Sequence, residues 1–202
     1  MIFEACTGCY EEAILAKNNG ANRIELCDNL KEGGTTPSYG TIKKTVENIK
    51  LPINVIIRPR GGNFIYSQVE KEIMYIDIEM CKKLGVNAIV IGALTNENKI
   101  DKSFIKKVEE ISGNMKITFH MAFDEIEDKK SAIDELIHLK IDRILTKGGE
   151  VSALNNLETL KELIKYADDR IIIMPGAGIN KHNRSLVIEE TGAKEVHGTK
   201  IV

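Results

Sequence analysis

Long apolar runs, basic clusters and a dinucleotide-binding glycine motif are all absent from this sequence of 202 residues. Its longest apolar stretches have the length of single strands, which excludes a membrane-spanning helix. A formal charge of −2 without any basic run gives no electrostatic footprint for nucleic acid. The first ten residues, MIFEACTGCY, lack the basic and apolar regions of a secretory leader. We therefore expect a cytoplasmic protein that engages neither membranes nor nucleic acid.

Cysteine is also scarce, with four residues in the chain. In a protein that is not exported, four cysteines indicate reduced thiols and not a disulfide framework. The hydrophobic fraction of 43% is ordinary for a globular protein, and the chain is long enough to bury a sizeable core.

One pattern repeats four times along the chain: a helix ends, usually at a glycine, and a small apolar residue and a polar residue lead into a strand. The four segments are NNGANRIELC (18–27), KLGVNAIVIG (83–92), HLKIDRILTKG (138–148), where Lys140 replaces the glycine, and ETGAKEVHG (190–198). Their spacing leaves room for one more strand and helix between neighbours. The strands expected in these intervals are INVIIR (53–58), KITFHM (116–121) and RIIIM (170–174), and IFEAC (2–6) is a further strand before the first segment.

Helical patterns fill the intervals, at residues 10–19, 39–49, 69–84, 103–111, 128–139, 155–167 and 181–191. The third begins with SQVE, a capping box of Ser67 and Glu70. Strict alternation predicts parallel βαβ units, in a TIM-like (β/α)8 barrel or a doubly wound open sheet. An open sheet normally binds its ligand at a glycine-rich turn after the first strand, and CTGCYEEA has no such motif. We favour a single barrel over residues 1–202, which lacks the final helix because the chain ends at HGTKIV.

Polar residues recur at the carboxyl ends of the expected strands, where barrel enzymes build their sites. Because alternate side chains of a strand share a face, Glu4 and Cys6 are expected to point inward, like Glu25 and Cys27 of the second strand. Other strands and the loops after them add further candidates for this mouth: Arg58, Arg60, Thr118, His120, Asp124, Thr146 and His197.

Two glutamates inside a barrel need partners, because desolvating a carboxylate is costly. Arg58 and Arg60 are the expected partners, or a cation is. The cluster is either an internal ion-pair network or a site at the mouth, and the number of contributing strands favours a site. In an enzyme, the two arginines would clamp a small carboxylate or phosphate. Glu4, Glu25 or His120 would then act as acid or base.

Two other features bear on such a site. Asp124 or Thr118 would hold His120 in one tautomer, which either catalysis or metal ligation would use. The turn MPGAGI contains Gly176 and Gly178, which would let backbone N–H groups approach an anion, although glycines also occur in any tight turn.

The cysteines have a metal-binding interpretation and a structural one. Cys6 and Cys9 form a C-x-x-C motif at the first junction of strand and helix, and Cys27 holds the matching position on the next strand. Soft thiolates select Cu(I) or zinc over hard cations. Free cysteine is also a common small core residue, and this is what we expect of Cys81.

The segments NRIELCDNLKEGGTTPSYG, IIRPRGGNFIYS, IGALT, ITFHMAFD, RILTKGG and MPGAGI follow one another along the chain, and together they resemble the CutC copper homeostasis protein family. The resemblance implies a TIM-like barrel, a cytoplasmic location, self-association into a dimer or larger homo-oligomer, and a link to copper. The family's cysteines that match Cys6 and Cys27 are candidate Cu(I) ligands. Seven further mouth residues match its motifs: Glu4, Glu25, Arg58, Arg60, Thr118, His120 and Asp124.

Two departures from the family follow. Cys9 is unexpected and would add either a third thiolate or a disulfide partner. Family members continue into a further helix, so we expect an exposed apolar strip along the first and eighth strands here. The resulting hypothesis is a CutC-type protein that binds Cu(I) at the barrel mouth; the alternative is a barrel enzyme acting on a small anion.

Overall fold

The computed structural model describes residues 1–202 and contains eight parallel strands with seven α-helices around them. The strands are β1 (Ile2–Thr7), β2 (Arg23–Leu26), β3 (Ile53–Ile56), β4 (Ala88–Ile91), β5 (Lys116–Phe119), β6 (Arg143–Thr146), β7 (Ile172–Pro175) and β8 (Glu195–Gly198). The helices are α1 (Tyr10–Asn18), α2 (Tyr39–Asn48), α3 (Gln68–Leu84), α4 (Lys102–Ser112), α5 (Lys129–His138), α6 (Leu157–Ala167) and α7 (Arg184–Thr191). Short 3-10 turns occupy Leu30–Glu32, Met121–Glu125 and Ala153–Asn156.

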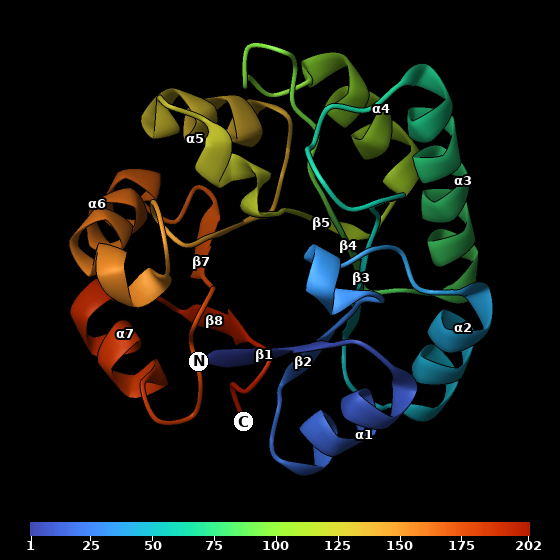
Figure 1. The fold of residues 1–202 in the computed structure, drawn as a ribbon, viewed down its shortest axis with the longest axis horizontal. Helices are drawn as coiled ribbons and strands as arrows, with labels where there is room; N and C mark the ends of the chain where they lie inside the picture. Colours follow the sequence, from blue (N-terminus) through green and yellow to red (C-terminus); the bar gives the residue numbers. More distant parts are fainter.

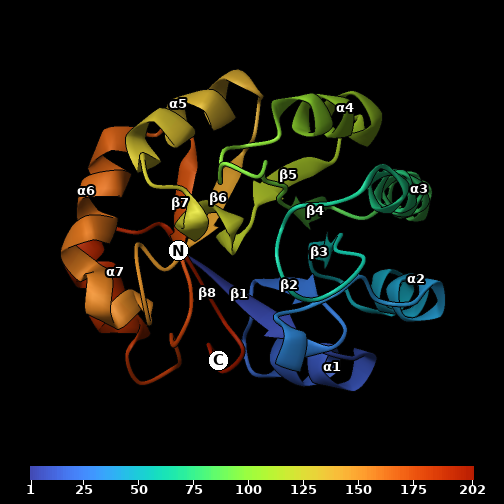
Figure 2. The ribbon, with the colours of Figure 1, turned by 45° about the horizontal axis from the view of Figure 1, so that its top comes forward.

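The strands follow the order β7-β6-β5-β4-β3-β2-β1-β8, and every paired neighbour is parallel. No ladder of hydrogen bonds joins β7 to β8, but these two end strands are in contact, so the sheet is a nearly closed barrel and not an open doubly wound sheet. The helices surround the strands in chain order, and the C-terminus lies in the gap between α7 and α1 (Figures 1 and 2). The expected TIM-like barrel is confirmed.

The helix ends agree with the repeat found in the sequence. Gly20, Gly85 and Gly192 have positive φ angles, a left-handed conformation that costs glycine little. Lys140, which replaces glycine in the third repeat, adopts the same conformation with φ 57°. Ser67 forms the predicted capping box at the start of α3.

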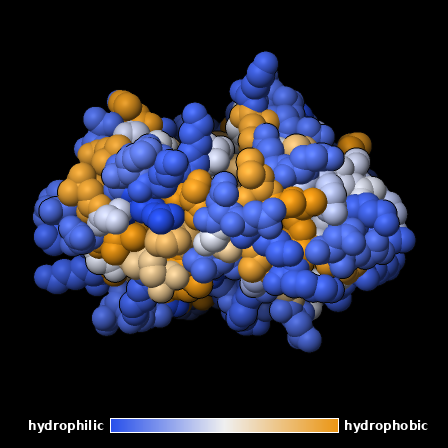
Figure 3. All heavy atoms as spheres, turned by 90° about the horizontal axis from the view of Figure 1, so that it is seen from below, coloured by the Kyte–Doolittle hydropathy of each residue, from blue (hydrophilic) through white to orange (hydrophobic).

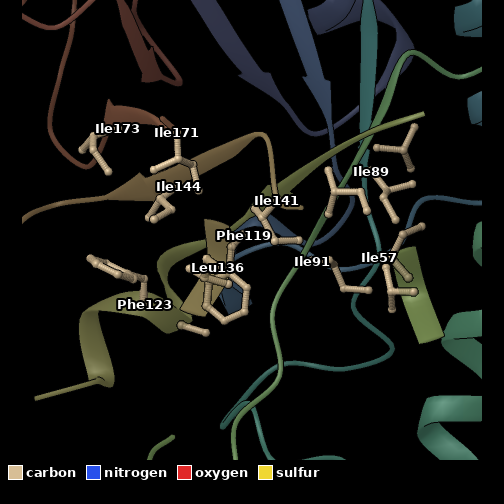
Figure 4. Close-up of a cluster of buried hydrophobic side chains, with 14 of the residues drawn as sticks. Ile57, Ile89, Ile91, Phe119, Phe123, Leu136, Ile141, Ile144, Ile171 and Ile173 are labelled. Carbon is tan, nitrogen blue, oxygen red and sulfur yellow. The ribbon is translucent and has the colours of Figure 1, made fainter. Parts of the chain in front are cut away.

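Two layers of side chains result from the strand alternation. Outward residues such as Ile57, Ile89, Ile91, Phe119 and Ile144 are buried between the strands and the helices, where they form the main hydrophobic core (Figure 4). Inward residues are mostly polar toward the carboxyl ends of β1, β2, β5 and β8, and these positions build the site described below.

The seam between α7 and α1 differs from the expectation. The predicted exposed apolar strip on β1 and β8 is absent, because Ala5 and Val196 are buried and the Arg184 guanidinium lies 4.0 Å from the centroid of the Phe3 ring. What remains is a groove of about 700 Å³ between α1 and the residues after β8, with the exposed Leu15 on its wall. Apolar residues do reach the surface on this side of the molecule (Figure 3). None of the helices combines the length and apolarity needed to cross a bilayer.

Candidate functional site

An ion-pair network fills the middle of the barrel. Arg23 donates to both Glu4 and Glu195, and Arg143 donates to Glu195 through Nε at 2.5 Å and Nη2 at 2.9 Å. Asn54 Nδ2 donates to Glu4 at 2.7 Å. All five side chains are buried, so their charges and polar atoms are satisfied by one another. The internal network that the sequence offered as one alternative therefore exists, with other members than those expected.

The expected pairing of the glutamates with Arg58 and Arg60 is wrong. Arg23 is the partner that sequence reasoning missed, although the signal was present: Arg23, Glu25 and Cys27 alternate along β2 and so share its inward face. Burial by itself would raise the pKa of Glu4. The hydrogen bond with His197 and the charge of Arg23 lower it instead to about 2, so this carboxylate is ionised.

His197 connects this network to the mouth of the barrel. Its Nδ1 lies 2.9 Å from Glu4 Oε1, and its Nε2 lies 3.5 Å from Glu25 Oε2. Burial alone would lower the pKa of His197, but Glu25, Cys6 and Glu4 raise it well above its usual value. Burial raises the pKa of Glu25, as does the charge of Cys6. The His197 ring is thus protonated and lies between the carboxyl groups of Glu4 and Glu25.

Two thiols lie next to this link. Cys6 Sγ and Cys27 Sγ are 3.9 Å apart, and the Cys27 thiol donates to Glu25 Oε2 at 3.4 Å. The hydrogen bond between the cysteines lowers the pKa of Cys6 and raises that of Cys27, so Cys6 loses its proton more readily than Cys27.

The ligand atoms of Cys6, Glu25 and Cys27 all lie within 4.8 Å of one another, a grouping that can hold a metal ion. For metal–sulfur bonds of about 2.3 Å, the length of a zinc–thiolate bond, sulfurs 3.9 Å apart subtend an angle of about 115° at the metal. This angle leaves room for a third ligand, and Glu25 is in position to be one. The donor set therefore fits a soft metal ion.

The other two cysteines lie elsewhere. Cys9 is the residue before α1, is partly exposed, and is not a member of this group, so the structure does not bring the expected third thiolate to the other two. Cys81 is buried in the core as expected, and burial raises its pKa to about 12.

A small cavity of about 110 Å³ opens beside the thiols at the carboxyl end of the barrel. Six of the residues predicted from the sequence line it: Cys6, Glu25, Cys27, Arg58, His120 and His197. The apolar wall of the cavity was not predicted, because its side chains belong to separate strands and loops: Ile56, Phe64, Met121 and Leu145.

Only one of the two predicted arginines lines the cavity. Arg58 donates to the carbonyl oxygens of Glu32, Gly34 and Gly62, at 2.7, 2.9 and 2.6 Å, and its guanidinium lies 5.0 Å from the centroid of the Phe64 ring.

Arg60 instead pairs with Glu70 of α3 at 2.6 Å, outside the cavity. The predicted double clamp is therefore wrong. Strand β3 ends at Ile56, so the alternation of a strand does not extend through Pro59 to Arg60.

His120 is fixed by its backbone neighbours. The Ala122 N–H donates to His120 Nδ1 at 3.1 Å, so the ring proton lies on Nε2. Burial, with the charge of Arg58, lowers the pKa of His120 to about 3, and the ring is neutral at pH 7. The ring also fits against Gly92, where a Cβ would lie 2.6 Å from Cε1 and Nδ1.

The predicted support of His120 by Asp124 or Thr118 is wrong. Asp124 accepts hydrogen bonds from Thr146 Oγ1 at 2.5 Å and from the Lys147 N–H at 3.1 Å, which fixes the loop after β5 to the end of β6. Thr118 lies deeper and accepts from Arg143 at 3.4 Å. None of these three predicted residues, Asp124, Thr118 and Thr146, lines the cavity.

Glu4 and the glycine turn after β7 are not part of the cavity lining either. The Gly176 N–H donates to the carbonyl of Thr146 at 2.9 Å, and a Cβ at this glycine would lie 2.6 Å from Leu145 Cδ1. Gly178 has φ 79°, and its carbonyl accepts from Asn183 Nδ2 at 3.0 Å. These glycines permit a tight turn and close packing, and the Gly176 N–H already has the Thr146 carbonyl as its hydrogen-bond acceptor.

Comparison of this chain with known proteins identifies its family. The CutC family pattern matches residues 1–202. The human "Copper homeostasis protein cutC homolog" is 42% identical over 97% of this chain and 72% of its own length. A CutC family protein of Enterococcus faecalis is 46% identical over the whole of both chains, so the expected extension past β8 does not apply to every relative.

A solved structure agrees with these sequence matches. The putative copper homeostasis protein CutC from Streptococcus agalactiae superposes with a TM-score of 0.96, at 39% identity and over 100% of both chains. The fold, the thiol pair at the barrel mouth and these matches lead to one conclusion: the chain belongs to the CutC family.

Proposed function

We propose that this protein binds Cu(I) as its cargo, through Cys6 and Cys27 at the carboxyl end of the barrel. The observation that carries the proposal is the 3.9 Å separation of two buried sulfurs, in a chain whose relatives are named copper homeostasis proteins. Thiolates are the soft ligands that Cu(I) prefers. Glu25 is the third group within reach.

The protonation of the site supports the proposal. A thiolate and not a thiol is the metal ligand, and the pKa of Cys6 is already lowered. The pKa of Cys27 is raised, so metal binding must displace its proton. Glu25 accepts a hydrogen bond from this thiol at 3.4 Å, and its own raised pKa makes its carboxylate a stronger base for that proton.

Burial suits a protein that holds copper. Cys6 is 9% exposed and Cys27 is 2% exposed, so an ion bound between them would be shielded from solvent and from competing thiols. A cytoplasmic location belongs to the same proposal, because cytosolic conditions keep thiols reduced.

Anaerobic titration with Cu(I) against a chromogenic Cu(I) chelator tests this function. We expect Cys6→Ser and Cys27→Ser to weaken binding at least about tenfold, the equivalent of about 1.4 kcal/mol. Cys9→Ser is the matched control, because Cys9 lies outside the group, and it should bind as the wild type does. Equal affinity of Cys27→Ser and the wild type would rule out the proposal, provided circular dichroism shows both to be folded.

A further inference from the structure

Two buried hydrogen-bond donors at the cavity have no partner. They are Arg58 Nε and His120 Nε2, and both residues line the cavity. Because Nδ1 of His120 accepts from the Ala122 N–H, Nε2 carries the proton and is a donor. Leaving a buried donor unsatisfied costs about 1–3 kcal/mol, so such groups normally meet water or a ligand. An acceptor inside the cavity would satisfy both donors.

The charge of Arg58 defines that acceptor further. Arg58 is 4% exposed, and its guanidinium donates only to backbone carbonyls. The other two buried arginines, Arg23 and Arg143, each pair with Glu195. Arg58 is thus the buried arginine without a carboxylate partner, and a buried cation normally has a counter-charge. An anion in the cavity would supply it.

The cavity selects among anions by size and by its walls. A volume of about 110 Å³ corresponds to roughly four water molecules at about 30 Å³ each. Part of the wall is apolar, and it is formed by Ile56, Phe64, Met121 and Leu145. A fully hydrated or doubly charged anion such as phosphate would leave polar surface against these side chains. A monoanion with a short carbon chain fits both the volume and the wall.

We propose that the cavity binds a small carboxylate, whose oxygens accept hydrogen bonds from Arg58 Nε and His120 Nε2. The carbon chain then packs against the apolar wall. The proposed copper ligands Cys6, Glu25 and Cys27 line the same cavity, but the donors differ: nitrogen groups of Arg58 and His120 would hold the organic anion, and sulfur atoms would hold Cu(I). It retains one arginine of the clamp expected from the sequence and replaces the second arginine with a histidine.

Matched ligands test the charge requirement. Propionate and propionamide have nearly the same shape and differ in charge, and inorganic phosphate is an anion without a carbon chain. At constant ionic strength, isothermal titration calorimetry of the full, reduced chain should show saturable binding of propionate, and of pyruvate as a second carboxylate. Propionamide and phosphate should bind at least about tenfold more weakly, as expected for losing a hydrogen bond to a charged group.

Variants test the position. His120→Phe keeps a ring beside Phe64 but removes the donor, and should weaken propionate binding at least about tenfold. His182→Phe is the control, because His182 is an exposed histidine. Leu145→Phe fills the cavity and should abolish binding. If a variant does not fold, an NMR titration of the wild type tests the proposal by itself. The signal of the His120 Nε2 proton should move downfield as propionate saturates the site.

Four results would overturn the proposal: no saturable binding of either carboxylate, tighter binding of phosphate, full affinity in folded His120→Phe, or an unmoved Nε2 proton signal. The Cu(I) affinity of His120→Phe is measured in parallel and should equal that of the wild type. The carboxylate site and the copper site can therefore fail independently.

Discussion

Replacing Glu4 with Gln removes the charge at the centre of the ion-pair network and keeps the shape of the side chain. Glu4 is completely buried and contacts Arg23, Asn54 and His197. The glutamine resembles the protonated acid, so the variant isolates the free energy that ionisation of this one carboxyl contributes to folding.

The size of the effect follows from the pKa. A fall in the pKa of Glu4 from 4.5 to about 2 corresponds to about 3 kcal/mol of free energy of unfolding at neutral pH. Because the folded-state pKa is the lower one, this stabilisation is present above pH 4.5 and is lost as the pH falls toward 2. At pH 3.5 about 2 kcal/mol should remain.

Urea unfolding followed by far-UV circular dichroism measures the difference, since the chain has no tryptophan for fluorescence. Wild type and Glu4→Gln should differ by about 3 kcal/mol at pH 7 and by about 1 kcal/mol less at pH 3.5. Glu47→Gln, on the surface of α2, serves as the control and should change little at either pH. A difference that is independent of pH, or smaller at pH 7 than at pH 3.5, would refute the reasoning.

Two further predictions rest on the geometry, and a third rests on the family resemblance. Gly92→Ala places a Cβ 2.6 Å from the ring of His120, so it should displace the ring and weaken propionate binding in calorimetry at least about tenfold. Gly40→Ala is the control and should not change binding, because no atom lies closer than 4.0 Å to its Cβ. Glu195→Gln leaves Arg23 and Arg143 without their shared carboxylate and should lower the free energy of unfolding by about 3–5 kcal/mol, and a loss below 1 kcal/mol would contradict this. Self-association remains a prediction, and sedimentation velocity that shows only monomers would contradict it.

The sequence predicted most of the secondary structure because the signals are local. The repeat of helix end, small apolar residue and strand recurs in every second unit. Where Lys140 replaces the glycine, the backbone keeps the same left-handed conformation. The inward direction of Cys6, Glu25 and Cys27 also followed from alternation alone, since each lies in or directly after a regular strand. The fold class, the thiol pair and about half of the residues that line the cavity could therefore be inferred from the sequence.

The ion-pair and hydrogen-bond partners of these side chains could not be inferred in the same way. Arg60 turns toward Glu70, and Asp124 joins Thr146, because both residues lie beyond a strand end, where periodicity no longer fixes direction. The pairing of Glu4 with Arg23 depends on the stagger between β1 and β2, which places Cα atoms of these two residues opposite each other.

By itself, the sequence determined the alternating βαβ order, with parallel strands, and the face on which each strand residue lies. These properties depend on local propensity and on the two-residue period of a strand. Only the tertiary structure decided which charges neutralise one another and which donors remain free beside a cavity. Those outcomes depend on strand register and on loop paths, and both are set by contacts between residues far apart in the chain.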